Sequence, residues 1–140
     1  EVGNVAGAQP VLIYQGITEP MLNNMKNHGG NPLGLAGSSG PVHLLHISCW
    51  WENESDDKTV YAFVNKFMEK VITEAKNVGV FNEYVYMNYA SMFQDAVAGY
   101  GAANKAQLKK IAKKYDPREV YQNLQPGYFK LDGPPVTPSF

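Results

Sequence analysis

The stretch PVHLLHISCWW, residues 41–51, decides the fold. Alternate residues of a strand point to opposite faces of a sheet. Here both faces carry large apolar side chains, with Leu44 and Trp50 on one face and Ile47 on the other. A strand that is apolar on both faces is typical of a sheet covered on both sides. We therefore predict a central strand over residues 41–51.

The spacing of apolar residues changes from two to three and four directly after this strand. Acidic residues in the connection 52–58 favour a helix N-terminus, and Gly79 is placed to end the helix. The sequence therefore predicts a long helix over residues 59–77 whose buried stripe is formed by Val60, Phe63, Val64, Phe67, Val71 and Ala75.

Working outward, the same rules predict further elements on both sides of this pair. They are a strand at 11–14, a helix from Thr18, capped by that hydroxyl, to His28, a brief strand around 33–35, a strand at 83–89 and a helix capped by Asn104 that runs to Lys114. A long helix and then a strand after a hairpin predict an α+β fold, in which an antiparallel sheet carries helices packed on one face.

Length and composition set limits on organisation and function. The 140 residues, of which 44% are hydrophobic, fit one folded domain, predicted at residues 1–131. Three of the last seven residues are proline, so residues 132–140 are predicted to be a flexible tail. A net charge of −1 favours neither nucleic acid nor an anionic membrane, and the apolar runs are too short to cross a bilayer.

Metal ligation and localisation receive little support. Cys49 is the single cysteine, which excludes an internal disulfide and a cysteine-based zinc site. His43 and His46 are three apart on a predicted strand and face opposite ways, so we predict no metal site. The triplet Asn53-Glu54-Ser55 is consistent with secretion, and localisation otherwise stays open. Because the chain begins at Glu1 without Met or a signal pattern, we expect a fragment of a longer protein.

Three other motifs have ordinary structural interpretations. The five lysines of the helix 104–114 are interpreted as a solvated face, with phosphate binding as the functional alternative. The glycine-rich run 29–34 lacks the P-loop lysine and is interpreted as a turn. Trp50, Trp51 and the tyrosines could stack on a planar ligand, although such residues more often belong to cores and sheet edges.

The run Tyr86-Met87-Asn88-Tyr89 places an amide and two phenols where the predicted strand ends. A strand that only packs would favour Val or Ile there. These groups can hydrogen-bond the carbonyl and imide edge of a flavin or a substrate hydroxyl. A phenol whose pKa is lowered by neighbours can also assist removal of a hydroxyl proton while a hydride leaves the carbon. The alternative is that they are satisfied structural polar residues.

This run resembles the Tyr-x-Asn-Tyr motif of the berberine-bridge-enzyme-like FAD-linked oxidoreductases, in the vanillyl-alcohol oxidase and p-cresol methylhydroxylase superfamily. The resemblance is greatest to the fungal branch and covers roughly residues 10–131. It continues through Ala90, Gln94-Asp95, Tyr100-Gly101, the segment from Lys114 to Gln122, and the ending Pro126 to Leu131.

The resemblance implies an incomplete substrate domain plus the C-terminal segment of a flavoenzyme. It implies FAD as cofactor, a small-molecule substrate such as a sugar or secondary metabolite, and an N-terminal FAD-binding domain that is missing here. It implies that Asn88 contacts the flavin, that Tyr86 and Tyr89 line the substrate side, and that Tyr89 assists proton abstraction. The chain alone is then expected neither to bind FAD nor to turn over substrate.

A second hypothesis from a different class remains. It is a non-catalytic α+β module that binds a small ligand or a protein through an aromatic sheet face.

Overall fold

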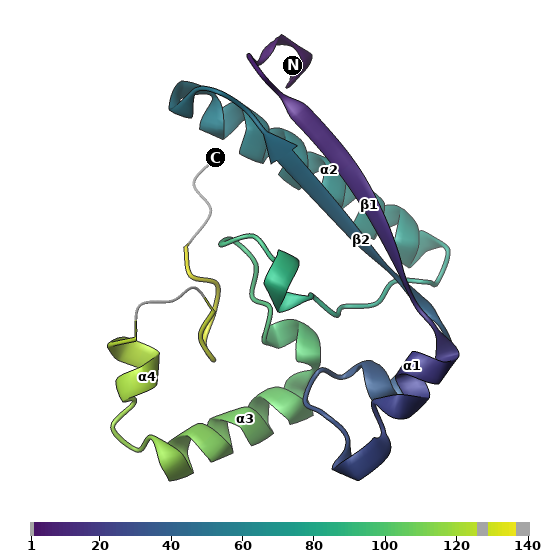
Figure 1. Ribbon diagram of the computed structural model, residues 1–140, viewed down its shortest axis with the longest axis vertical. Helices are drawn as coiled ribbons and strands as arrows, with labels where there is room; N and C mark the ends of the chain where they lie inside the picture. Colours follow the sequence, from purple (N-terminus) through teal and green to yellow (C-terminus); the bar gives the residue numbers. More distant parts are fainter. Residues whose placement is uncertain (1, 126–128, 137–140) are drawn as a thin grey trace. The chain divides into compact units, whose positions relative to one another are not determined.

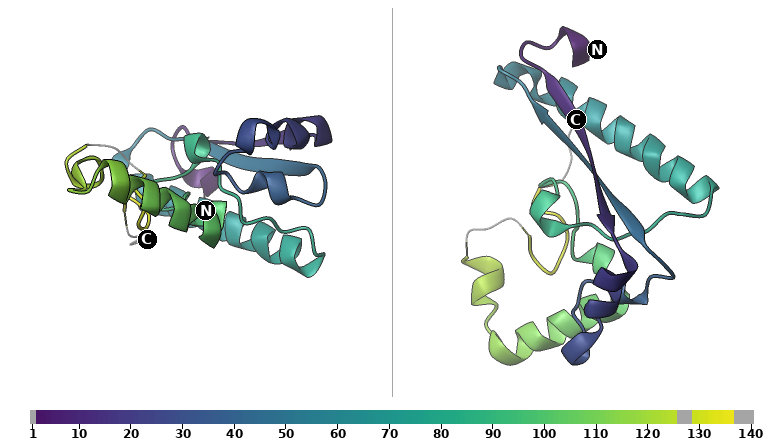
Figure 2. Two further views of the ribbon diagram at one scale, coloured as in Figure 1. Left: turned by 90° about the horizontal axis from the view of Figure 1, so that it is seen from below. Right: turned by 45° about the vertical axis from the view of Figure 1, so that its right-hand side comes forward.

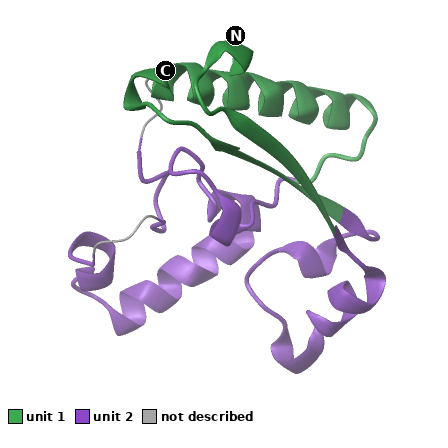
Figure 3. Cartoon of the chain, turned by 45° about the horizontal axis from the view of Figure 1, so that its top comes forward, with its two compact units in different colours: residues 1–15, 43–82, 139–140 green, residues 16–42, 83–138 purple. Residues whose placement is uncertain are grey.

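The computed structural model describes residues 2–125 and 129–136. The chain divides into two compact units (Figure 3). The first comprises residues 1–15, 43–82 and 139–140, and the second comprises residues 16–42 and 83–138. Two of the boundaries between the units fall within strands. One lies after Gln15, in the strand Gln9–Ile17 (β1), and the other after Val42, in the strand Val42–Trp50 (β2).

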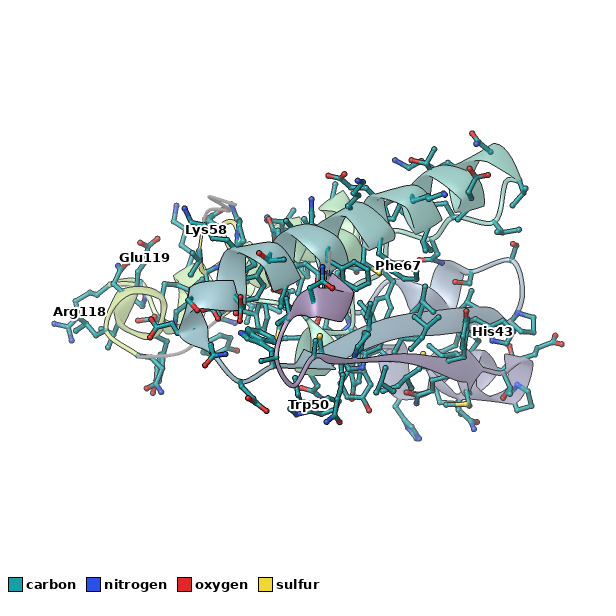
Figure 4. The ribbon with its side chains drawn as sticks, turned by 90° about the horizontal axis from the view of Figure 1, so that it is seen from above. His43, Trp50, Lys58, Phe67, Arg118 and Glu119 are labelled. Carbon is teal, nitrogen blue, oxygen red and sulfur yellow. The ribbon has the colours of Figure 1, made fainter. Side chains whose placement is uncertain are left out.

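The first unit is a two-stranded sheet with a long helix. Strand β1 (Gln9–Ile17) pairs with β2 (Val42–Trp50) in antiparallel fashion (Figures 1 and 2), and helix α2 (Asp57–Asn77) follows. In Figure 4, Phe67 lies on the side of α2 that faces the strands, whereas Trp50 extends from the other side of the sheet. One helix thus covers one face of the sheet.

Trp51 fixes the connection between β2 and α2. Its indole Nε1 donates a hydrogen bond of 2.7 Å to the Asp57 carboxylate at the start of α2. Its ring meets that of Tyr61 edge to face, with 5.6 Å between centroids. Val60, one turn into the helix, is buried. The apolar stripe predicted from the 3.6-residue period therefore begins at this contact.

The second unit contains the remaining helices, α1 (Glu19–Asn24), α3 (Ala102–Tyr115) and α4 (Val120–Asn123). Short 3-10 turns connect them, at Asn27–Gly29, Leu35–Gly37, Met87–Tyr89 and Ala98–Tyr100. Its apolar core is small. Ile17, Leu22 and Leu35 are buried, and Met25, Val42 and Tyr84 pack against them half-buried.

The predicted α+β class is confirmed, as are the strand at 41–51 and the long helix. The prediction that this strand is central is wrong for the described residues, because β2 pairs only with β1 in a two-stranded sheet. Val11 to Tyr14 of β1 are all exposed. These side chains keep between 39% and 68% of their surface exposed.

Two predicted strands are absent. Around residues 33–35, Gly34 adopts a left-handed conformation with φ +82°, which ends the extended run and starts the 3-10 turn Leu35–Gly37. Residues 83–89 pair with no strand, and the run instead closes into a 3-10 turn in which the Tyr89 amide donates to the Tyr86 carbonyl. Aromatic residues favour strands only where a partner strand is available.

The predicted helix start at Thr18 is confirmed, but the capping interactions predicted for Thr18 and Asn104 are not observed. Thr18 occupies the N-cap of α1 but makes no side-chain capping hydrogen bond, and α1 ends at Asn24 rather than at His28. Gly101 occupies the N-cap of α3, and Asn104 lies inside the helix, where its amide donates to the Tyr100 carbonyl at 2.9 Å. An asparagine can bond backward to a carbonyl four residues away as readily as it caps.

The predicted division at residue 131 stays a prediction. Residues 137–140 of the predicted tail lie outside the described residues, and Val136 donates a backbone hydrogen bond of 3.1 Å to Met92. Among the described helices, none combines the length and apolar character needed to cross a bilayer.

Candidate functional site

Four tyrosines and one asparagine gather in the second unit, and we call Tyr84, Tyr86, Asn88, Tyr89 and Tyr100 the tyrosine cluster. The rings of Tyr84 and Tyr100 stack, with 6.0 Å between centroids and 21° between planes. Those of Tyr86 and Tyr89 meet edge to face at 4.9 Å and 78°. The Asn88 amide donates to the Tyr86 hydroxyl oxygen at 2.7 Å. Among the described residues, the cluster thus includes two ring pairs and a polar bridge.

Exposure increases along the cluster. Tyr100 is 7% exposed and Tyr84 is half-buried, whereas Tyr89 is 45% exposed and Asn88 is exposed. Burial, with smaller contributions from the phenols of Tyr100 and Tyr86, raises the pKa of Tyr84 to about 12. Burial and the Tyr86 phenol also raise the pKa of Tyr100. The inner phenols therefore stay neutral at physiological pH, and the outer groups are accessible to a ligand.

The turn from Asp95 to Tyr100, here named the 95–100 turn, adjoins the cluster and is anchored by Asp95. Its carboxylate accepts hydrogen bonds from the Ala98 amide at 2.9 Å and from Lys105 of α3 at 3.1 Å. Partial burial opposes ionisation of Asp95. These two donors and the Gly133 amide outweigh that burial and hold the pKa of the carboxyl below its usual range.

Acid should remove the contribution of Asp95 to stability. Because its pKa is lower in the folded than in the unfolded chain, this contribution is complete above the unfolded value of about 4 and is lost as pH falls through the folded pKa. We expect Asp95→Asn to reduce the free energy of unfolding at pH 7 by roughly 1 kcal/mol, and by less at pH 3. Urea unfolding at both pH values measures the difference.

Asp132→Asn provides the control for this prediction. Asp132 also pairs with a lysine of α3, Lys109, but both side chains are far more exposed than those of Asp95 and Lys105. Exposed ion pairs contribute little, so this variant should unfold like the parent at both pH values. An equal loss in the two variants would contradict the special role of Asp95.

The structure brings together Tyr86, Asn88 and Tyr89, the site residues predicted from the sequence. It does so through the 3-10 turn Met87–Tyr89 and not through a strand end. Their roles toward a flavin or a substrate stay predictions. Tyr84 and Tyr100 were not predicted as site residues. The sequence signal for Tyr100 was the Tyr100-Gly101 pair, and Tyr84 precedes Tyr86 by one strand period.

Clusters of metal-ligating side chains are absent from the described part of the chain. Within residues 2–125 and 129–136, no group of three or more His, Cys, Asp or Glu side chains is placed to hold a metal ion. His46 instead lies 3.2 Å from the Ser48 hydroxyl on β2.

Comparison with known proteins defines the class to which this site belongs. Residues 85–126, which hold most of the tyrosine cluster, match the family described as "Berberine and berberine like". The chain is 37% identical over 122 residues to the FAD-dependent monooxygenase FUP4 of Fusarium proliferatum, 87% of this chain and 24% of that protein. No solved structure matches significantly.

Two further fungal relatives agree. The FAD-dependent monooxygenase tpcD of Cochliobolus heterostrophus is 34% identical over 123 residues, 88% of this chain and 24% of that protein. The FAD-dependent monooxygenase drtC of Aspergillus calidoustus is 32% identical over 132 residues, 94% of this chain and 24% of that protein. The relatives thus define the class as fungal FAD-linked oxidoreductases, of which this chain matches a part.

More narrowly, the chain carries the berberine-like segment of the fungal FAD-linked oxidoreductases, and the recognition made from the sequence is confirmed. FAD, which the resemblance implied, is the cofactor named for these relatives. The chain spans about a quarter of the length of the relatives it matches.

Proposed function

We propose that this chain forms the substrate-side part of an FAD-dependent oxidoreductase that removes a hydride from an organic substrate, a sugar or a secondary metabolite. The observation that carries the proposal is the exposed edge of the tyrosine cluster, which lies within the berberine-like segment. Bound FAD would accept the hydride and later return electrons to oxygen. An FAD-binding domain is the proposed partner that would complete the site.

The outer residues of the cluster fit contact with a flavin and a hydroxylated substrate. Asn88 is exposed and offers an amide, which can both donate to a ring carbonyl and accept from an imide N–H. Tyr86 accepts from Asn88, and its own hydroxyl hydrogen is left to donate elsewhere. Asn88 is therefore the proposed cofactor contact, and Tyr86 is proposed to orient the substrate.

Tyr89 is the proposed proton-handling residue. Its phenol is the more exposed of the outer ring pair, and its ring orientation is fixed edge to face by Tyr86. A fixed phenol can receive a hydrogen bond from a substrate hydroxyl and assist loss of that proton as the hydride leaves the neighbouring carbon. In this proposal Tyr86 orients the substrate hydroxyl and Tyr89 assists removal of its proton, whereas bound flavin would supply the redox chemistry.

Replacing Tyr89 by Phe tests this proposal in a longer, flavin-loaded polypeptide that carries the chain. General acid–base groups contribute about 10²–10⁴-fold, so we expect kcat to fall about a hundredfold while flavin content is unchanged. Tyr115→Phe is the matched control, because Tyr115 lies exposed at the end of α3. Unchanged turnover in Tyr89→Phe would remove the proton role.

The 140-residue chain alone serves as the second control. Because the FAD-binding domain is proposed to lie outside these 140 residues, we expect no flavin absorbance and no turnover. A stoichiometric yellow complex of the chain alone would contradict the need for a partner domain. The alternative, a non-catalytic binding module, is supported by the exposed aromatic sheet residues Tyr14 and Trp50. It predicts that the chain binds a ligand without flavin chemistry.

A further inference from the structure

The outer ring pair of the tyrosine cluster has no strand to hold it, so something else must fix Tyr86. The described backbone from Glu83 to Tyr86 belongs to no strand, and the backbone hydrogen bonds Tyr89 N–H to Tyr86 C=O and Ala90 N–H to Met87 C=O that close the next turn are local. A single 3-10 turn is a weak local structure. The position of Tyr86 therefore depends on what packs against the residues before it.

The 95–100 turn packs against those residues at Gly99. A Cβ atom at Gly99 would lie 2.5 Å from the carbonyl oxygen of Glu83 and 2.9 Å from the amide nitrogen of Val85. Backbone thus meets backbone here, at a separation that only glycine permits. Segment 83–85 cannot move toward the turn, and this close approach defines its path.

Tyr100 provides the second contact. Its ring stacks on that of Tyr84, which also packs against the apolar core of the second unit. Its carbonyl oxygen accepts from the Asn104 amide at 2.9 Å. Gly34 comes so close that a Cβ atom there would lie 2.6 Å from the same oxygen. Tyr100 is therefore held by α3 through Asn104 and by the Gly34 loop.

We propose that Tyr100 is a positioning residue, which acts through Tyr84 and segment 83–85 to hold Tyr86 and Tyr89 in their edge-to-face arrangement. The expected effect on turnover rests on the proposed function. The expected effect on the ring positions rests on the contacts described above. Misplacement of a reacting group by about 1 Å can cost on the order of a hundredfold in rate. The buried Tyr100 side chain would thus influence turnover without touching substrate.

Two replacements of Tyr100 test the proposal. Tyr100→Phe keeps a planar ring for stacking, whereas Tyr100→Leu keeps an apolar side chain, smaller and without a ring. In the 140-residue chain with labelled tyrosine rings, NMR measures the contact between Tyr86 and Tyr89. We expect Tyr100→Leu to lose this contact and Tyr100→Phe to retain it. A contact preserved in Tyr100→Leu, or lost equally in both, would overturn the proposal.

Turnover gives the second readout, in the longer flavin-loaded polypeptide. We expect Tyr100→Leu to lower kcat about tenfold to a hundredfold with little change in KM or flavin content, and Tyr100→Phe to restore kcat. Suppose that Tyr89→Phe leaves turnover unchanged while Tyr100→Leu still abolishes the contact between the Tyr86 and Tyr89 rings. The proton role of Tyr89 then fails, and the positioning role of Tyr100 is supported. The two proposals are therefore distinguishable.

Gly99→Ala is the second variant, and it keeps the proposal testable if Tyr100→Leu does not fold. The added methyl would push segment 83–85 away, so the Tyr86 and Tyr89 ring signals should shift. Gly37→Ala is its control, since Gly37 lies in the same unit with nothing within 4 Å of an added Cβ atom. Ring signals that stay in place in Gly99→Ala would overturn the proposal.

Discussion

Leu35→Ala should unfold the second unit at markedly lower denaturant concentration than the parent. Leu35 is 2% exposed and packs with Ile17 and Leu22 in the apolar core of that unit. Truncation of a buried leucine typically costs about 2–5 kcal/mol, because apolar contacts are lost and a cavity remains. Since Leu35 is among the most completely buried large side chains of the described residues, the loss should be a large fraction of the total stability of a marginal domain.

Urea unfolding followed by tyrosine fluorescence measures this loss. Leu124→Ala is the matched control, because Leu124 lies in the same unit next to α4 but is 74% exposed. The same truncation at an exposed site should change the free energy of unfolding by less than about 0.5 kcal/mol. If both variants unfold together with the parent, the assigned core is wrong.

The predictions that succeeded rest on local periodicity. The strand at 41–51 and the helix at 59–77 each follow from the spacing of apolar residues along one stretch of chain. Trp51 adds what periodicity cannot predict, since its hydrogen bond to Asp57 is the contact that joins the strand's end to the helix. The fold class was thus predictable from sequence, but its internal contacts were not.

The predictions that failed depend on partners distant in the chain. Residues 83–89 have the composition of a strand, yet whether they form one depends on a neighbouring strand that the described residues do not supply. They meet the backbone of Gly99 instead. No local pattern in 83–89 indicates that contact, because glycine at 99 is equally consistent with an ordinary turn.

The candidate site was predicted by residue type and not by geometry. Amide and phenol groups concentrated at Tyr86, Asn88 and Tyr89 led to the predicted chemistry. The structure brings these residues into contact, and their roles stay predictions. Tyr100 was missed because its stacking on Tyr84 joins residues sixteen apart through a fold that the sequence pattern does not specify. The ion pair of Asp95 with Lys105 was missed for the same reason.

Gly34→Ala should be the second severely destabilising substitution. Gly34 has φ +82°, a conformation that costs other residues about 1–2 kcal/mol. In addition, a Cβ atom would lie 2.6 Å from the Tyr100 carbonyl oxygen. Because that oxygen is held by Asn104, it cannot retreat without loss of a hydrogen bond. We therefore expect a total loss of about 3 kcal/mol or more in the free energy of unfolding.

Gly29→Ala separates the two causes. Gly29 has φ +91° and lies in the same unit, but nothing would come within 4 Å of its Cβ atom. It should therefore show only the backbone strain, about 1–2 kcal/mol. The excess loss in Gly34→Ala then measures the contact with Tyr100. Combining Gly34→Ala with Asn104→Ala should cost less than the sum of the two, because the carbonyl is released. Equal losses in the two glycine variants would show that Gly34 does not hold Tyr100.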